Sequence, residues 1–120
     1  MLTNQEISDN LITLPSQIAT EAEKVENTRY NWEKAKLQLK ASEAKKKLEL
    51  KVSRLETKKL SDNQIDLQVD QDCLSERIAV LGMESVYKKA RIQMERLIEE
   101  HDSMKALAYL KQREMKNGID

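Results

Sequence analysis

Apolar residues recur at intervals of three, four and seven along the first half of the chain, the spacing that puts side chains on one side of a helix. The stripe consists of Ile18, Ala22, Val25, Trp32, Ala35 and Leu39. After a phase shift near Leu37 it resumes as Ala41, Ala44, Leu48, Val52 and Leu55. The pattern predicts one long helix over residues 14–59, with a shift of the kind found where a seam departs from a strict 3.5-residue period.

The second half of the chain has a heptad pattern, which predicts a second long helix over residues 71–116. One line of the heptad is formed by Cys73, Val80, Tyr87, Met94, His101 and Ala108. Three residues after it comes a second line, formed by Met83, Ala90, Leu97 and Met104. Asn117-Gly118 is a typical helix stop, so the helix is expected to end just before it.

Capping signals divide the rest of the chain. Thr3 and Glu6 match the capping box of a short helix over residues 3–12, and Pro15 is tolerated in the first turn of the long helix that follows. Ser61 and Gln64 predict a helical connector over residues 61–70, and Asp70 can cap the helix after it. These signals predict a short N-terminal helix, a long helix, a connector and a second long helix.

The fold class expected from these elements is all-α. Two long helices joined by a connector of about ten residues favour a long antiparallel two-helix hairpin, coiled-coil-like, within a single helical domain 1–120. The composition agrees, because 39% hydrophobic and only 3% aromatic residues suit a narrow seam better than a broad core.

Chemistry-bearing motifs are scarce in this sequence. It has no Gly-rich phosphate loop and no nucleophile paired with a base at a known spacing, so no enzyme and no catalytic residue is expected. A single Cys and a single His predict no metal site, no cofactor and no internal disulfide. With no secretion signal and no run of 18 apolar residues, the expected location is the cytoplasm, without membrane contact.

The net charge is zero, because the chain has 21 basic and 21 acidic residues. Only the distribution of charge along the chain can therefore indicate a binding partner. If the hairpin turn centres near residue 65, residues 34–47 face residues 83–96. A basic band is then expected from Lys34, Lys36, Lys40, Lys45, Lys46, Lys47, Lys88, Lys89, Arg91 and Arg96. Toward the turn it continues with Lys51, Arg54, Lys58 and Lys59. The connector, with Asp62, Asp66, Asp70 and Asp72, forms an acidic end.

Two interpretations of the basic band stay open. The lysines can simply solvate a helix face, or they can neutralise phosphates in sequence-independent, salt-sensitive binding of nucleic acid. The residues expected to bind nucleic acid are Lys40, Lys45, Lys46, Lys47, Lys51, Arg54, Lys88, Lys89 and Arg91. Tyr30 is the better candidate for stacking on an unpaired base, because Trp32 lies on the apolar stripe.

The basic stretch Glu43-Ala44-Lys45-Lys46-Lys47-Leu48-Glu49-Leu50-Lys51, with Arg54-Leu55 after it and Tyr30 and Trp32 before it, resembles phage recombination mediator proteins of the UvsY type. The resemblance implies a small helical oligomer that binds single-stranded DNA and helps to load a RecA-like recombinase in place of a single-strand-binding protein. The DNA-contacting Leu-Lys-Ala-Arg-Leu core of that family is matched at Leu50-Lys51. Ser53 stands at the position of its arginine and Arg54 follows one residue later, which leaves Lys51 as the firmest correspondence.

Self-association is expected independently of the resemblance. Several apolar residues lie off the narrow seam, and an exposed stripe of this kind usually marks a contact surface. They are Leu74, Ile78, Leu81, Ile92, Ile98, Leu107 and Leu110. We expect contacts through the second helix and the N-terminal helix. The sequence therefore supports two hypotheses: an oligomeric, non-enzymatic DNA-binding accessory of a recombinase, or a structural or adaptor coiled coil, such as a phage assembly scaffold or an inhibitor of a host protein.

Overall fold

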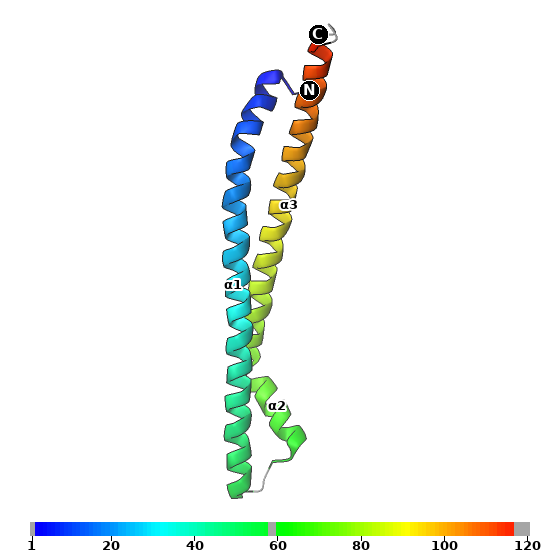
Figure 1. The fold of residues 1–120 in the computed structure, drawn as a ribbon. Helices are drawn as coiled ribbons and strands as arrows, with labels where there is room; N and C mark the ends of the chain where they lie inside the picture. The colour runs from blue at the N-terminus through cyan, green and yellow to red at the C-terminus, as the bar shows by residue number, and fades with distance from the viewer. Residues whose placement is uncertain (1, 58–59, 117–120) are drawn as a thin grey trace. The chain divides into compact units, whose positions relative to one another are not determined.

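The computed structural model describes residues 2–57 and 60–116, and these residues form three helices (Figure 1). They are α1 (Asn4–Thr57), α2 (Asp62–Asp72) and α3 (Leu74–Lys116). No strand occurs in the described ranges, so the all-α prediction is confirmed. Two compact units can be distinguished: a terminal unit (Met1–Asn27 and Lys88–Asp120) and a connector unit (Thr28–Tyr87). In each unit a stretch of α1 packs on a stretch of α3 that runs antiparallel to it, as predicted for a hairpin.

Helix α1 is continuous through Pro15, so the predicted break between a helix at 3–12 and one at 14–59 is wrong. The predicted cap at its start is confirmed, since the Thr3 hydroxyl accepts a hydrogen bond from the Glu6 amide at 3.1 Å. Ile7 and Leu14 are both buried in one cluster with Met104 of α3. This shared cluster spans the predicted junction at residue 13, and the helix continues beyond Pro15 although a proline removes one bond from the helical ladder.

The apolar seam of α1 in the connector unit keeps its phase, so the predicted shift near Leu37 is wrong. Leu39 and Leu50 contact the core of α2, and the half-buried positions between them are Ser42, Glu43 and Lys46. The stripe that was expected to continue the seam faces solvent instead, with Leu48 64% and Leu55 78% exposed. Polar side chains occupy the seam because they find charged partners on the other helices, and a count of apolar positions cannot detect such pairs.

Helix α2 begins as the capping signal predicts. The Gln64 amide donates to the Ser61 hydroxyl at 3.3 Å, and the Ser61 amide donates to Gln64 Oε1 at 2.8 Å. The helix then runs past the predicted end at residue 70 to Asp72, and α3 begins at Leu74 rather than at residue 71. The core of this region is built from Ile65 and Val69 of α2 and from Cys73, which follows the helix. These side chains pack against Leu39 and Leu50 of α1 and against Leu60.

The heptad line of α3 is largely confirmed. Cys73, Ala90 and Met104 are buried, and the other half-buried positions of the two lines are Val80, Tyr87, Met94, Leu97, His101 and Ala108. The prediction that Met83 lies in the seam is wrong, because Met83 is 40% exposed and its neighbour Glu84 is half-buried. All the residues predicted to lie off the seam, from Leu74 to Leu110, are exposed.

Candidate nucleic-acid interface

The pairing of α1 with α3 in the connector unit differs from the expected register by about ten residues. The Trp32 ring stacks on Tyr87 with centroids 5.3 Å apart, and Arg77 bonds to Glu43 at 3.0 Å. The reason is α2, which takes up residues that were assigned to the turn and to the start of the second long helix. As a consequence, Lys46 contacts Asp72 rather than a residue near position 84.

The predicted basic band is therefore divided. Its α1 members, from Lys34 to Arg54, lie in the connector unit. Lys88, Lys89 and Arg91 belong to the terminal unit, where all three are exposed and Arg91 lies 3.8 Å from Glu95. The α1 residues thus form a site of their own, which is described here within the connector unit.

Four cations lie along one side of α1: Lys40, Lys47, Lys51 and Arg54, which we call the cation line. Successive members are seven, four and three residues apart, the spacing of one helical face. The line covers about 20 Å at a rise of 1.5 Å per residue. Lys40 and Lys51 are exposed and have no ion-pair partner within residues 2–57 and 60–116. These two side chains are available to an anionic ligand.

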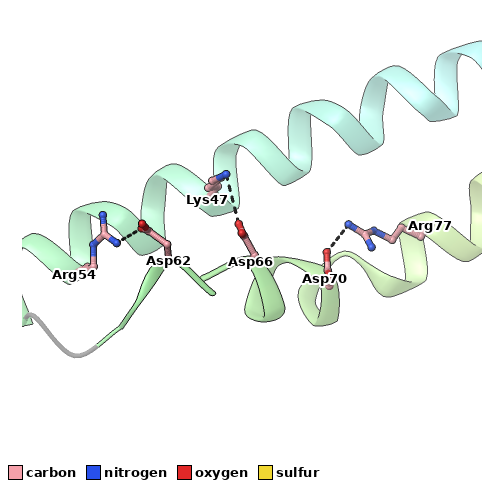
Figure 2. A network of polar contacts seen from close by, with 6 residues as sticks. All are labelled: Lys47, Arg54, Asp62, Asp66, Asp70 and Arg77. Atoms are coloured by element: carbon pink, nitrogen blue, oxygen red, sulfur yellow. Dashed lines mark hydrogen bonds and ion pairs between the residues drawn. The ribbon is translucent and has the colours of Figure 1, made fainter. Parts of the chain in front are cut away.

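The other two members of the cation line are paired with α2, as Figure 2 shows. Lys47 Nζ lies 3.5 Å from Asp66, and Arg54 donates to the Asp62 carboxylate. The hydrogen bond and the positive charge of Arg54 lower the pKa of Asp62 below its ordinary value. Half of the line is thus neutralised inside the molecule.

The remaining predicted α1 residues lie off the cation line. Lys46 faces the seam and contacts Asp72 at 3.2 Å. Lys45 is exposed, has no partner among the described residues, and lies about 140° around the helix from Lys40. The structure therefore does not put the three consecutive lysines on one surface, because one position on a helix is a 100° turn.

Arg77 joins the three helices at the other end of α2. Its guanidinium donates to Glu43 of α1 at 3.1 Å. It also donates to Asp70 of α2 at 2.6 Å (Figure 2). The hydrogen bond to Glu43 and the charge of Asp70 raise the pKa of Arg77, which stays protonated. Asp70 therefore serves a different purpose from Asp62 and Asp66, since it binds α3 rather than the cation line.

The aromatic residues have separate environments. Trp32 is half-buried against Tyr87, with Lys36 Nζ 4.0 Å from its ring centre, which confirms the preference for Trp32 as a packing residue. Tyr30 is 65% exposed. It lies on the same side of α1 as Leu37 and Leu48, about 15 Å along the helix before Lys40, and is available for stacking.

Sequence reasoning missed Arg77 and the partners of the cations. Asp62, Asp66 and Asp70 are four residues apart, which puts them on one face of a capped helix, and this spacing was the available signal. From the sequence alone, these aspartates are expected to form an acidic end of the hairpin, because the spacing does not show that the connector lies against α1.

Other kinds of site find little support in the described parts of the chain. No group of three His, Cys, Asp or Glu side chains there could hold a metal ion. Neither does any described helix combine the length and apolar character needed to cross a membrane. The chain matches no protein-family model, and no curated protein or solved structure matches it either.

Proposed function

We propose that this protein is a non-enzymatic accessory of DNA recombination or replication that binds single-stranded DNA through α1 of the connector unit. The observation that supports this most is the cation line, which arranges Lys40, Lys47, Lys51 and Arg54 along one helical face. Basic side chains at such spacing neutralise successive phosphates and release the counterions held by them. The phosphates of a nucleic-acid strand also follow one another in a row, so they can contact these cations in succession.

Single-stranded rather than double-stranded DNA is favoured by Tyr30. Its ring is 65% exposed on the same helix, about 15 Å before Lys40, and every base has a face on which such a ring can stack. The resemblance at Leu50-Lys51 points to the same ligand and adds a recombinase and a single-strand-binding protein as expected partners. In this proposal the protein acts as a homo-oligomer and brings several cation lines to one DNA strand.

The proposal is tested by removing the exposed lysines that have no ion-pair partner. The K40A/K51A variant should bind a fluorescent oligothymidine at least tenfold more weakly than the wild type at low salt, because two counterion-releasing contacts of the cation line are lost. The variant K105A/K116A removes two positive charges from the terminal unit and is the matched control. Equal affinities of the two variants would contradict binding at the cation line.

The alternative function is that of a structural or adaptor coiled coil, and one observation favours it. Leu37, Leu48 and Leu55 are 66%, 64% and 78% exposed, and they lie on the side of α1 opposite the seam. An exposed apolar stripe is typical of a surface that binds another helix. Absence of oligonucleotide binding by the wild type at low salt would favour this alternative.

A further inference from the structure

We propose that α2 is a built-in competitor for the nucleic-acid site, whose carboxylates occupy half of the cation line until a polyanion replaces them. This inference rests on the proposed function and concerns the regulation of the same site. It starts from the partners of the four cations. Asp66 pairs with Lys47 and Asp62 pairs with Arg54, while Lys40 and Lys51 are left open.

The charge of α2 suits this role. The helix Asp62–Asp72 contains four aspartates and no basic residue. Asp62 and Asp66 are one helical turn apart and meet cations that are two turns apart on α1. A row of carboxylates at regular intervals presents anionic oxygens to the cation line much as the phosphates of a DNA strand would.

The competing ion pairs are of a kind that exchanges easily. The side chains of Asp62 and Asp66 are 81% and 61% exposed, so water and salt reach both pairs. Exposed pairs of this type contribute little to stability. A DNA strand can therefore replace both carboxylates at small cost, and afterwards the aspartates rotate into solvent.

The body of α2 is held by other contacts. Ile65 and Val69 are buried against α1, and Asp70 is bonded to Arg77 of α3. These contacts keep the carboxylates near the cation line and fix a high local concentration of the competitor. The expected consequence is that α2 weakens binding of every anion, so that only ligands with closely spaced charges displace it.

The test compares the D62N/D66N variant with the wild type in a salt titration of oligothymidine binding. The variant should bind roughly three- to tenfold more tightly at moderate salt, because two exposed pairs no longer compete. The slope of log K against log salt should stay close to that of the wild type, since the same phosphates are neutralised once the carboxylates have been replaced. The matched control is E99Q/E100Q, which removes two exposed negative charges from the terminal unit and should leave affinity and slope close to wild type.

A second pair of variants covers the case in which D62N/D66N fails to fold. D66N and E99Q each remove one exposed negative charge, but only Asp66 faces the cation line. D66N should bind more tightly than E99Q. Equal affinity of D66N and E99Q, or equal behaviour of D62N/D66N and its control, would overturn the inference.

The same titration separates this inference from the proposed function. If the wild type binds through its lysines and D62N/D66N binds with the same affinity, the inference about α2 is wrong and the proposed function still holds. Binding by both proteins at low salt, followed by binding of D62N/D66N alone at moderate salt, supports both. If neither protein binds, both proposals fail.

Discussion

Asp66 of α2 lies 3.5 Å from the ammonium of Lys47 on α1, within the stretch of lysines that dominates the sequence. The acidic connector is therefore not an end of the molecule separate from the basic segment. It folds back on that segment and supplies three of its counterions, through Asp62, Asp66 and Asp72. The electrostatic character of the site depends on both helices.

The Arg54–Asp62 pair should give a pH-dependent contribution to stability. The pKa of Asp62 is lowered in the folded protein, chiefly by the hydrogen bond from Arg54. A lowered carboxyl pKa stabilises the folded state above the unfolded pKa, and the contribution is lost as pH falls through the folded value. Wild type should therefore unfold at higher urea than D62N at pH 7, and the difference should vanish well below about pH 4. A difference that persists at pH 2 would contradict the pairing.

The packing of α2 against α1 should depend on Ile65. This side chain is fully buried, so Ile65→Ala removes apolar contacts and leaves a cavity that costs about 2–5 kcal/mol of the free energy of unfolding. Leu67 lies on the same helix but is 63% exposed, and Leu67→Ala should stay within about 0.5 kcal/mol of wild type. Urea unfolding followed by circular dichroism measures both. Equal losses would show that α2 does not have this orientation.

Cys73 should be protected from thiol reagents. It is buried where α2 meets α3, and desolvation raises the pKa of its thiol, with Glu76 adding to the effect. Both burial and a low thiolate fraction slow alkylation. Mass spectrometry should find slower labelling of the wild type than of the C73S/S75C variant, whose thiol lies on an exposed position. Ile65→Ala should accelerate labelling of Cys73, and equal rates in all three proteins would contradict the buried environment.

Self-association should depend on the exposed apolar residues of α3. Leu74, Ile78 and Leu81 are 56%, 59% and 64% exposed and follow each other at intervals of four and three. The I78E/L81E variant should lower the average mass seen by sedimentation at micromolar concentration, with unchanged helix content, because charges prevent the burial of this stripe. A wild type that is monomeric at these concentrations would refute the expected homo-oligomer.

The sequence was sufficient for the elements that depend on local signals. The caps at Thr3 and Ser61 and the heptad line from Cys73 to Ala108 were predicted from spacing alone, since capping and periodicity act within a few residues. The continuity of α1 through Pro15 could not be predicted in this way. The predicted junction at residue 13 is bridged by Met104, which is distant in the chain and packs against both Ile7 and Leu14.

The site was harder to predict than the fold. Lys40 and Lys51 could be selected as exposed cations, but the seam position of Lys46 could not, because Asp72 holds it from another helix. The apolar stripe of Leu48 and Leu55 favoured a phase shift, since apolar residues are normally assigned to the core. Charged pairs across the seam reversed that assignment, and the residues that form them are far apart in sequence.

The most direct test of the central claim is the salt dependence of oligothymidine binding by the unmodified protein. Neutralisation of four phosphates by the four members of the cation line predicts that log K falls with log salt with a slope of about −3. Binding should be tight at low salt and weak at physiological ionic strength. Absence of binding at low salt, or binding that does not change with salt, would contradict the account.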